Sequence, residues 1–394
     1  MESAKIMEKQ IVKEPEQRKA LFILQAFPGI LLCIVIMLLG IFFAYLLGNF
    51  LTNFGILPAE SSNPISGIFV AILLGILIRN VVGLKSEFEI GVKYAIKFFL
   101  KAGIILLGIR LSLLDALKLG MWGVPIILVC IASGLLVTLW LAKKLNQSNR
   151  LATLTACGTG ICGVTAIMAT SPAIKAKDDE VSYAIANITI FGLIGMLAYP
   201  YLAFLLFGDD PIRAGLFLGT AIHDTAQVTG AALIFDQTFQ VEKVVDVATI
   251  TKLTRNVFIV AVIPIMTYFF LRKEKNKAGE AYKAAKWYQL FPFFVLGFLL
   301  FSIIRTFGDA GLTKSGMAFG ILTEDSWMAF YQMLSLLGSQ YILGVAMAAV
   351  GLSTSFKVFK GLGMRPFYVG LAAALSVGVV SISMVYLFGG FITM

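Results

Sequence analysis

Apolar runs long enough to cross a bilayer recur along this 394-residue chain, and they limit its fold more than any other feature. About twenty apolar residues in a helix span the ~30 Å hydrocarbon core of a membrane. Hydrophobic residues make up 59% of the chain and charged residues only 14%, against about 25% charged residues in an ordinary soluble domain. Because hydrocarbon offers no partner to backbone N–H and C=O groups, the spans must be helical. The sequence therefore predicts an all-α polytopic membrane protein.

Eleven spans are expected, preceded by a charged cytoplasmic tail, 1–26, that lacks the apolar region of a signal peptide. Basic residues concentrate in this tail and in the loops after the even-numbered spans, which predicts a cytoplasmic N-terminus and an external C-terminus. Residues 27–394 form the expected transmembrane domain, with a cytoplasmic loop at 272–286 between its halves. The expected spans are 27–47, 64–80, 92–111, 122–142, 150–171, 181–207, 211–235, 247–271, 287–306, 327–350 and 367–392.

Several functional classes do not fit this composition. The net charge of +10 comes mainly from loop residues, so no nucleic-acid partner is expected. The cysteines, Cys33, Cys130, Cys157 and Cys162, lie in apolar runs without a CxxC motif, which predicts neither a disulfide framework nor a metal site. No soluble segment is long enough to form a catalytic domain, so we expect neither an enzyme nor a cofactor.

Eleven spans suggest two inverted five-helix repeats with discontinuous crossing helices, plus one additional span. In this scheme span five pairs with span ten, because Leu154–Gly160 is echoed by Leu334–Gln340. A competing match between Gly108–Ser112 and Gly351–Ser355 would pair span three with span ten. Both registers stay open.

A Gly-Thr-x-Ile string occurs twice, as Gly158–Ile161 in span five and Gly219–Ile222 in span seven. Gly158, Gly160 and Gly163 fall close together, and a glycine costs about 1 kcal/mol in a helix interior. The cluster predicts an interrupted helix whose free N–H groups bind an anion. Close helix packing through small residues is the alternative.

Spans seven and eight carry charged and titratable side chains. His223 is the only histidine of the chain and stands beside Asp224, so this pair is expected to carry a coupling proton. A neutral His223 that only donates a hydrogen bond is the alternative. Lys252 and Arg255 lie on one helix face and are expected to neutralise an oxyanion, unless they extend to the membrane interface.

The chain resembles the YeiH-type membrane proteins, a family named for sulfate export, from about residue 27 to its end. The strings that carry the likeness are Gly158–Ala166, Ser171–Lys177 with Glu180 and Val181, Ile222–Gln227, and Lys252–Arg255. Val164-Thr165 departs from the small residue and serine expected in relatives, but the threonine still supplies a hydroxyl. The resemblance implies alternating access, crossing broken helices, a dimer, and sulfate or a sulfonate as substrate.

We therefore expect a secondary anion transporter of the inner membrane, with its site where spans five and ten cross and spans seven and eight approach. His223 and Asp224 are the expected proton-coupling residues. The expected substrate-binding residues are Gly158, Thr159, Gly160, Cys162, Gly163, Thr165, Thr225, Gln227, Lys252, Arg255, Ser339 and Gln340.

Three alternatives remain open. A sodium-coupled carboxylate transporter would use Asp224, Thr159 and backbone carbonyls to hold sodium. An arsenite exporter would use Cys157 and Cys162 as thiol ligands. A membrane enzyme or receptor is the third, although the sequence offers no nucleophile–base pair.

Overall fold

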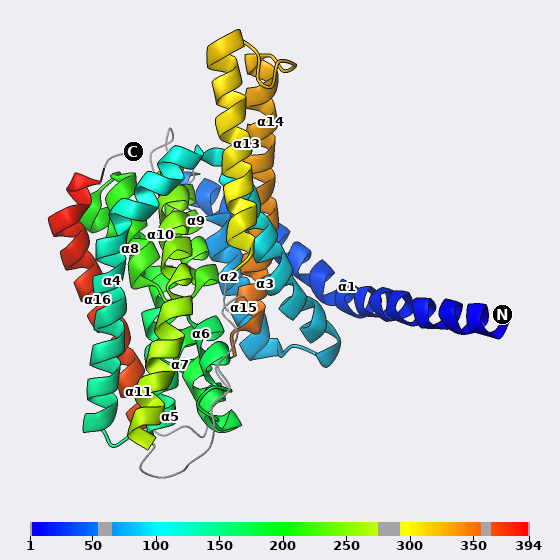
Figure 1. Ribbon diagram of the computed structural model, residues 1–394. Helices are drawn as coiled ribbons and strands as arrows, with labels where there is room; N and C mark the ends of the chain where they lie inside the picture. Colours follow the sequence, from blue (N-terminus) through cyan, green and yellow to red (C-terminus); the bar gives the residue numbers. More distant parts are fainter. Residues whose placement is uncertain (1, 54–64, 275–291, 356–363, 393–394) are drawn as a thin grey trace.

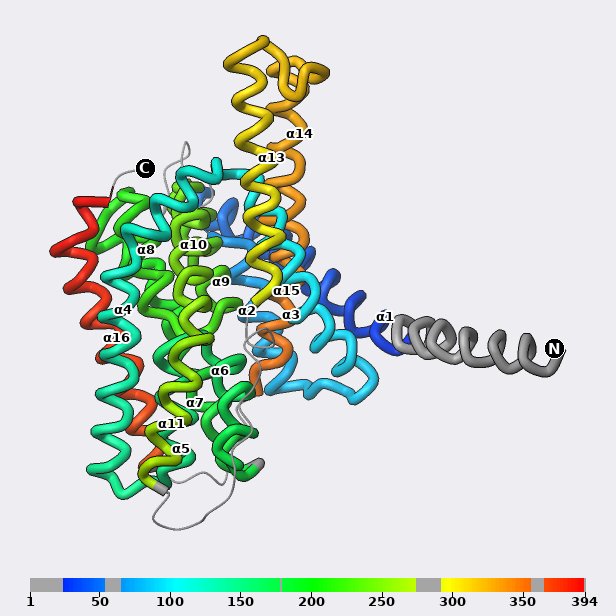
Figure 2. Tube along the Cα trace, in the orientation of Figure 1, coloured from blue at the N-terminus to red at the C-terminus, as the bar shows by residue number. Residues whose placement is uncertain are grey.

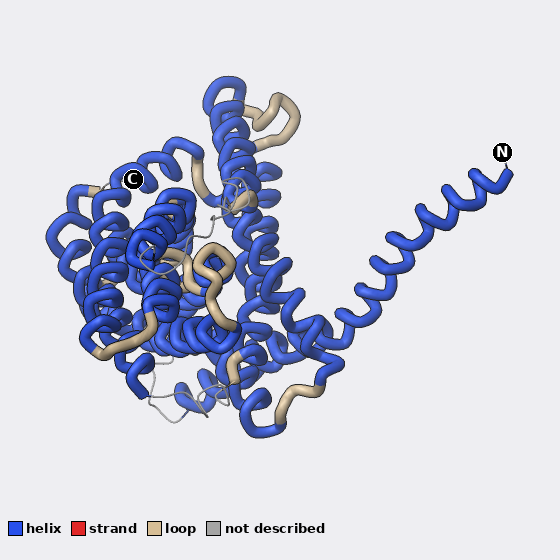
Figure 3. Tube along the Cα trace, turned by 60° about the horizontal axis from the view of Figure 1, so that its bottom comes forward, coloured by secondary structure: helices blue, strands red, loops and turns tan. Residues whose placement is uncertain are grey.

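The computed structural model describes residues 2–53, 65–274, 292–355 and 364–392, and nearly all of these residues are helical (Figures 1 and 3). Within these ranges the β-structure consists of an isolated bridge between Ala318 and Leu322. Six of the described helices are long and apolar enough to cross a membrane, or seven when α10 and α11 are taken as one bent span. The predicted all-α polytopic class is confirmed. The predicted loop 272–286 lies outside the described residues from residue 275 onward.

The helices form two groups that stand side by side in Figure 1. We call the first the flanking bundle. It consists of α1 (Glu2–Asn53), α2 (Gly67–Leu77), the π-helical turn η1 (Ile78–Val82), α3 (Ser86–Leu107), the short turn η2 (Gly108–Arg110), α13 (Phe294–Ser315), α14 (Glu324–Leu336), the π-helical turn η3 (Leu337–Ile342) and α15 (Leu343–Ser353). Close packing holds it together: a Cβ on Gly29 of α1 would lie 2.7 Å from the Cα of Gly91 in α3, as expected where small residues let membrane helices approach.

The second group, which we call the hairpin bundle, surrounds two interrupted helices. It consists of α4 (Leu113–Lys144), α5 (Asn149–Gly160), α6 (Val164–Thr170), α7 (Asp178–Phe207), α8 (Pro211–Ala221), α9 (Thr225–Phe239), α10 (Lys243–Val257), α11 (Ile259–Glu274), α16 (Met364–Phe388) and the terminal turn η5 (Gly389–Phe391). The two bundles touch chiefly where α9 meets α2 and α15 and where α4 meets α13.

Helices α5 and α6 form a hairpin that enters and leaves the bundle on one face, called the lower face because it is at the bottom of Figure 1. The Ser148 hydroxyl at the start of α5 donates a 2.6 Å hydrogen bond to Glu180 in the first turn of α7. The chain therefore returns to its starting face before α7 begins. We call α5–α6 the first hairpin.

Helices α8 and α9 form a second hairpin, which enters from the opposite, upper face. Only Gly208–Asp210 separate the end of α7 from the start of α8. Phe204 near the end of α7 stacks on Phe239 at the end of α9, with ring centroids 3.9 Å apart. The start of α8 and the end of α9 thus share a face, and both hairpins can be followed in Figure 2.

The two hairpins correct the predicted topology. The expected spans 150–171 and 211–235 have the apolar length of a crossing, but the chain reverses inside each. The chain between α6 and α7, which carries Lys175 and Lys177, lies on the same lower face as the start of α5, whereas the sequence predicts opposite sides for these two loops. Hydropathy indicates how much apolar chain is present, but it does not show on which side of the membrane the chain emerges.

Helices α10 and α11 make a complete crossing beside the hairpins, with a 42° bend between them. Arg110 at the upper face pairs with Glu242 just before α10. At the lower end, the Lys273 ammonium of α11 donates to the Asn149 side chain across 2.8 Å. Because α10 packs along α8, residues in the middle of this crossing reach the tips of both hairpins.

Candidate functional site

The first hairpin turns at three residues that leave the helical conformation. Helix α5 ends at Gly160, Ile161 has φ −122° and ψ −93°, and Gly163 precedes α6 with φ +68° and ψ −125°. A positive φ with this ψ is readily adopted only by glycine. The predicted interruption in span five is therefore present, and Gly163 is the residue that permits it.

The second hairpin turns by different means. Helix α8 ends at Ala221, and Ile222 and Asp224 are extended, with φ of −89° and −95°. The Asp224 carboxylate accepts a 2.9 Å hydrogen bond from the Ala226 N–H and so caps α9. Aspartate is among the best residues for this position because its side chain replaces the missing helical acceptor.

The two tips meet inside the hairpin bundle. A Cβ on Gly163 would lie 3.1 Å from an Asp224 carboxylate oxygen. The same carboxylate interacts with the backbone N–H of Val164 at the start of α6. The Asp224 carboxylate therefore faces the N-terminal ends of α6 and α9, the second helix of each hairpin.

Two cations of α10 face the opposite helix ends, the C-terminal ends of α5 and α8. Lys252 donates to the carbonyl oxygens of Ile161 (2.9 Å) and Ile222 (3.1 Å), and also to that of His223. Both Lys252 and Arg255 are completely shielded from solvent, with exposed fractions of 1% and 0%. Cations are favourable at helix C-termini, where unpaired carbonyls concentrate negative partial charge.

The planar guanidinium group of Arg255 bridges the same two helix ends. It donates to the carbonyls of Thr159 (2.7 Å) and Gly160 (3.1 Å) in the first hairpin. In the second hairpin it donates to the carbonyl of Thr220 across 2.6 Å, with a longer 3.4 Å contact to Ile222. Arg255 thus joins the two hairpins to one helix.

These bonds show that the two Gly-Thr-x-Ile strings are structural equivalents. The threonine carbonyl of each string accepts from Arg255, and the isoleucine carbonyl of each accepts from Lys252. Because the hairpins enter from opposite faces, the relation is an inverted one. Span five therefore corresponds to span seven in this arrangement, and span ten, which contains the π-helical turn η3, is one continuous span without the expected interruption.

The expected anion cradle in Gly158–Gly163 is also corrected. The Ile161 and Gly163 N–H groups donate to the carbonyls of Cys157 and Gly158, so they are not free. This segment is the C-terminal end of α5 and presents carbonyls, which Lys252 and Arg255 occupy. In this conformation neither cation has the exposure needed to contact an anion, and both act on the backbone instead.

Accessible polar groups lie at the starts of α6 and α9. Thr165 on α6 is exposed, and Asp224 and Thr225 are half-buried. The Asn256 amide donates a 3.1 Å hydrogen bond to the Thr225 hydroxyl, and Asn256 is itself 4% exposed. The sequence motifs do not single out Asn256, and its position directly after Arg255 is the only signal they offer for it.

Several buried polar atoms near the tips make no hydrogen bond within the described part of the chain. They are Thr159 Oγ1, His223 Nδ1, Gln227 Oε1, Thr251 Oγ1 and Asn256 Oδ1. Buried polar groups are normally paired with protein or water. His223 is only 2% exposed and faces the charges of Lys252 and Arg255.

Other predicted site residues lie elsewhere or have structural partners. The Gln227 amide donates to the Thr189 carbonyl across 2.9 Å and so ties α9 to α7. Cys162 is buried in the first turn beside the tips. Ser339 and Gln340 line a cleft near the upper face, together with Arg110.

Three cationic residues of the expected span 92–111, Lys97, Lys101 and Arg110, do not share one environment. Lys97 and Lys101 are exposed on the surface of α3. Arg110 is bound by carboxylates of another element, as described below. Among the described residues, no group of three or more His, Cys, Asp and Glu side chains is arranged to hold a metal ion.

The fold and site define a class: an all-α, multi-pass membrane protein with two opposed helical hairpins whose tips meet at buried cations. The chain belongs to the family described as conserved hypothetical protein 698, whose model matches residues 28–370. This confirms the membrane-protein family that the sequence resemblance predicted.

Curated relatives carry the name UPF0324 membrane protein. One from Fusobacterium nucleatum is 32% identical over 368 residues, covering 92% of this chain and 98% of the relative. One from Streptococcus pyogenes is 34% identical over 362 residues, covering 92% and 97%. One from Bacillus anthracis is 33% identical over 331 residues, covering 83% and 88%. These names establish a membrane protein and assign no activity.

Proposed function

We propose that this protein is a secondary active transporter, not an enzyme, that moves a small anion such as sulfate or a sulfonate across the cell inner membrane. The lower face, which carries Lys143, Lys144, Lys175 and Lys177, is the cytoplasmic side in this proposal, following the positive-inside rule. The protein acts as a homodimer and exports its substrate, as the family resemblance implies.

The observation that carries the proposal is the charge at the hairpin tips. Lys252 and Arg255 bring two formal positive charges, and Asp224 brings one negative charge. A charge inside a membrane protein is costly and typically marks a substrate or ion pathway. The surplus positive charge favours an anion over a cation at this point.

The accessible edge of the tips supplies the contacts. Thr225 and Thr165 offer hydroxyl donors, and the start of α9 adds the positive end of a helix dipole. The Asn256 amide orients Thr225 through their 3.1 Å hydrogen bond. Lys252 and Arg255 attract the anion through their field while they hold the hairpins in place.

Proton coupling is assigned to Asp224 rather than to His223. Asp224 is half-buried and lies where an incoming anion would be repelled by its charge. A proton on Asp224 would remove that repulsion, so anion and proton would bind together. His223 is almost inaccessible and stands beside two cations.

Alternating access follows from the two bundles. The limited contact between the hairpin bundle and the flanking bundle allows one to move against the other. Because α10 bonds to both hairpin tips, these elements would move together. Opposed interrupted helices that face a central site are a recurrent design in secondary transporters.

The test is uptake of radiolabelled sulfate and methanesulfonate into proteoliposomes under an imposed pH gradient. We expect Thr225→Val and Asn256→Leu each to reduce uptake at least about tenfold, the effect of losing ~1.4 kcal/mol of interaction. Asp224→Asn should retain the α9 cap and make uptake independent of the pH gradient.

Thr267→Val is the control, because it makes the same substitution at a hydroxyl on α11 that is buried, has no hydrogen-bond partner among the described residues and lies outside the tips. Uptake that is unaffected by Thr225→Val and Asn256→Leu would refute the site. Uptake of a carboxylate driven by a sodium gradient would favour the sodium-coupled alternative instead.

A further inference from the structure

A polar cleft of about 760 Å³ lies near the upper face, outside the hairpin tips. One wall comes from α9 and the start of α10, and the other from α13, α14 and η3, so the cleft lies between the two bundles. Its volume falls within the range of small-molecule sites, about 300–1,000 Å³. Leu233 and Leu336 are the aliphatic members of its lining.

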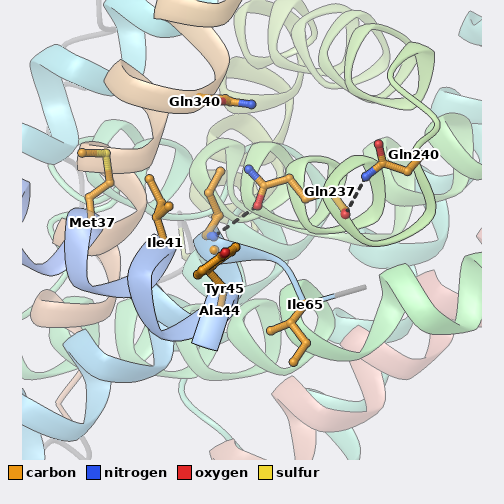
Figure 4. A pocket seen from close by; sticks show the side chains of 10 residues that line it. Met37, Ile41, Ala44, Tyr45, Ile65, Gln237, Gln240 and Gln340 are labelled. Carbon is orange, nitrogen blue, oxygen red and sulfur yellow. Dashed lines mark hydrogen bonds between the residues drawn. The ribbon is translucent and has the colours of Figure 1, made fainter. Parts of the chain in front are cut away.

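The remaining lining residues bear amide, hydroxyl or charged groups. The uncharged ones are Gln237, Gln240, Tyr331, Gln332, Ser335, Ser339 and Gln340. An adjoining pocket of about 280 Å³ shares Gln237, Gln240 and Gln340, and Gln340 lies across from Gln237 in Figure 4. Polar side chains at membrane depth are tolerated where they line a water-filled cavity, so this lining indicates an aqueous space.

The π-helical turn η3 places Ser339 and Gln340 at this cleft. π-helical turns are rare and frequently occur at functional sites. The Ser339 hydroxyl donates to the Ser335 carbonyl across 2.8 Å. Gln340 and Gln332 are exposed. The sequence pattern that selected Ser339 and Gln340 therefore marks this cleft, and the hairpin tips do not account for it.

The charges of the lining balance. Arg110, Lys243 and Arg305 stand against Asp236, Glu242 and Asp246. Arg110 pairs with Glu242 and with Asp246, each across 2.9 Å. This balance differs from the hairpin tips, where positive charge is in surplus.

A second guanidinium is also neutralised. Arg305 bonds to Asp309 across 2.6 Å and lies 3.6 Å from the centre of the Tyr331 ring. Neither wall therefore presents an unpaired guanidinium that would concentrate anions.

We infer that this cleft is a water-filled access chamber, open on the upper face, that admits small hydrophilic solutes of either charge sign. It serves as the outer entrance of the transport path and holds solutes through its amides and hydroxyls. Selection for anions takes place beyond it, at the hairpin tips. This role rests on the proposed transport function, but the accessibility and charge neutrality of the chamber do not.

The experiment measures the reaction of introduced cysteines with two membrane-impermeant methanethiosulfonates, the anionic ethylsulfonate and the cationic trimethylammonium-ethyl reagent. The native cysteines are buried, so the full-length chain needs no prior removal of thiols. Gln332→Cys and Gln340→Cys probe the chamber, and Thr225→Cys probes the tips. Asp209→Cys on the upper turn and Lys143→Cys at the lower end of α4 define the two faces.

Rates are divided by those of free 2-mercaptoethanol with each reagent. We expect Gln332→Cys and Gln340→Cys to react from the face that labels Asp209→Cys, with normalised rates for the two reagents that agree within about threefold, a difference of ~0.65 kcal/mol. Thr225→Cys should favour the anionic reagent. Adding Lys243→Glu to Gln340→Cys should shift the ratio toward the cationic reagent.

Absence of labelling at Gln332→Cys and Gln340→Cys, or labelling only from the face of Lys143→Cys, would overturn the inference. A strong preference of these positions for either reagent would overturn its charge neutrality. If sulfate and methanesulfonate uptake fails while both positions label as expected, the proposed substrate is wrong and the chamber stands.

Discussion

The tips of the two hairpins begin with the same Gly-Thr-x-Ile string and then turn by different devices. In both, the threonine and isoleucine carbonyls accept hydrogen bonds from Arg255 and Lys252. The first hairpin then reverses through Gly163 at φ +68°. The second keeps ordinary backbone angles and caps its next helix with Asp224. The shared string thus specifies the backbone acceptors, and the residues after it specify the turn.

The side chains of the two threonines differ as well. The Thr220 hydroxyl lies 2.7 Å from the Ser381 hydroxyl and donates to the Leu216 carbonyl. The Thr159 hydroxyl has no hydrogen-bond partner among the described residues. At equivalent positions, therefore, the Thr220 hydroxyl contacts α16, whereas the Thr159 hydroxyl is an unsatisfied polar group.

The largest expected effect on stability comes from removing Arg255, whose hydrogen bonds both hairpins share. Arg255→Leu leaves the Thr159, Gly160 and Thr220 carbonyls without their donor, and each buried unpaired group costs about 1–3 kcal/mol. We expect a loss of about 3 kcal/mol or more in the free energy of unfolding. The thermal midpoint in detergent, followed by tryptophan fluorescence, measures it.

Arg272→Leu is the control for this change, because Arg272 is exposed at the lower end of α11. An Arg255→Leu midpoint equal to that of Arg272→Leu would show that the guanidinium does not hold the hairpins together.

A smaller effect is expected where the two turns differ. Gly163→Ala forces a side chain into a backbone conformation that costs about 1–3 kcal/mol, and its Cβ would also approach Asp224. Gly123→Ala in α4 is the matched control, since its Cβ would meet only ordinary contacts at 3.7 Å and alanine is the better helix former. The midpoint should fall for Gly163→Ala and stay level or rise for Gly123→Ala.

If both alanine variants changed the midpoint equally, the first hairpin would not depend on its glycine turn. The comparison with the Asp224 cap would then lose its basis.

The smallest expected effect is a difference in stability between variants of Thr220 and Thr159. Thr220→Val breaks the contact with Ser381 and should cost about 1 kcal/mol. Thr159→Val removes a hydroxyl that has no partner, so stability should be unchanged or slightly higher. Chemical unfolding of both variants in matched detergent provides the measurement, and equal losses would contradict the assigned difference.

Sequence patterns selected several residues that the structure brings together at the hairpin tips, but they did not predict the arrangement. The glycine cluster predicted the interruption near Gly163, whereas the break at Asp224 was not predicted, and the proton-coupling role of His223 and Asp224 stays a prediction. The expected roles of Lys252 and Arg255 were not supported, because their partners are distant in the chain: Arg255 and Gly160 are 95 positions apart. No local pattern reveals that a buried cation is already satisfied by carbonyls.

What the sequence by itself determined is the all-helical membrane class, because apolar composition and the need to pair every backbone group leave few other folds. It also marked the first turn, since a cluster of glycines is unfavourable inside a helix. Only the tertiary structure decided that two apolar runs reverse instead of crossing. A run of that length is equally apolar in a span and in a hairpin, and the choice depends on which helix ends meet and which distant cations stabilise them.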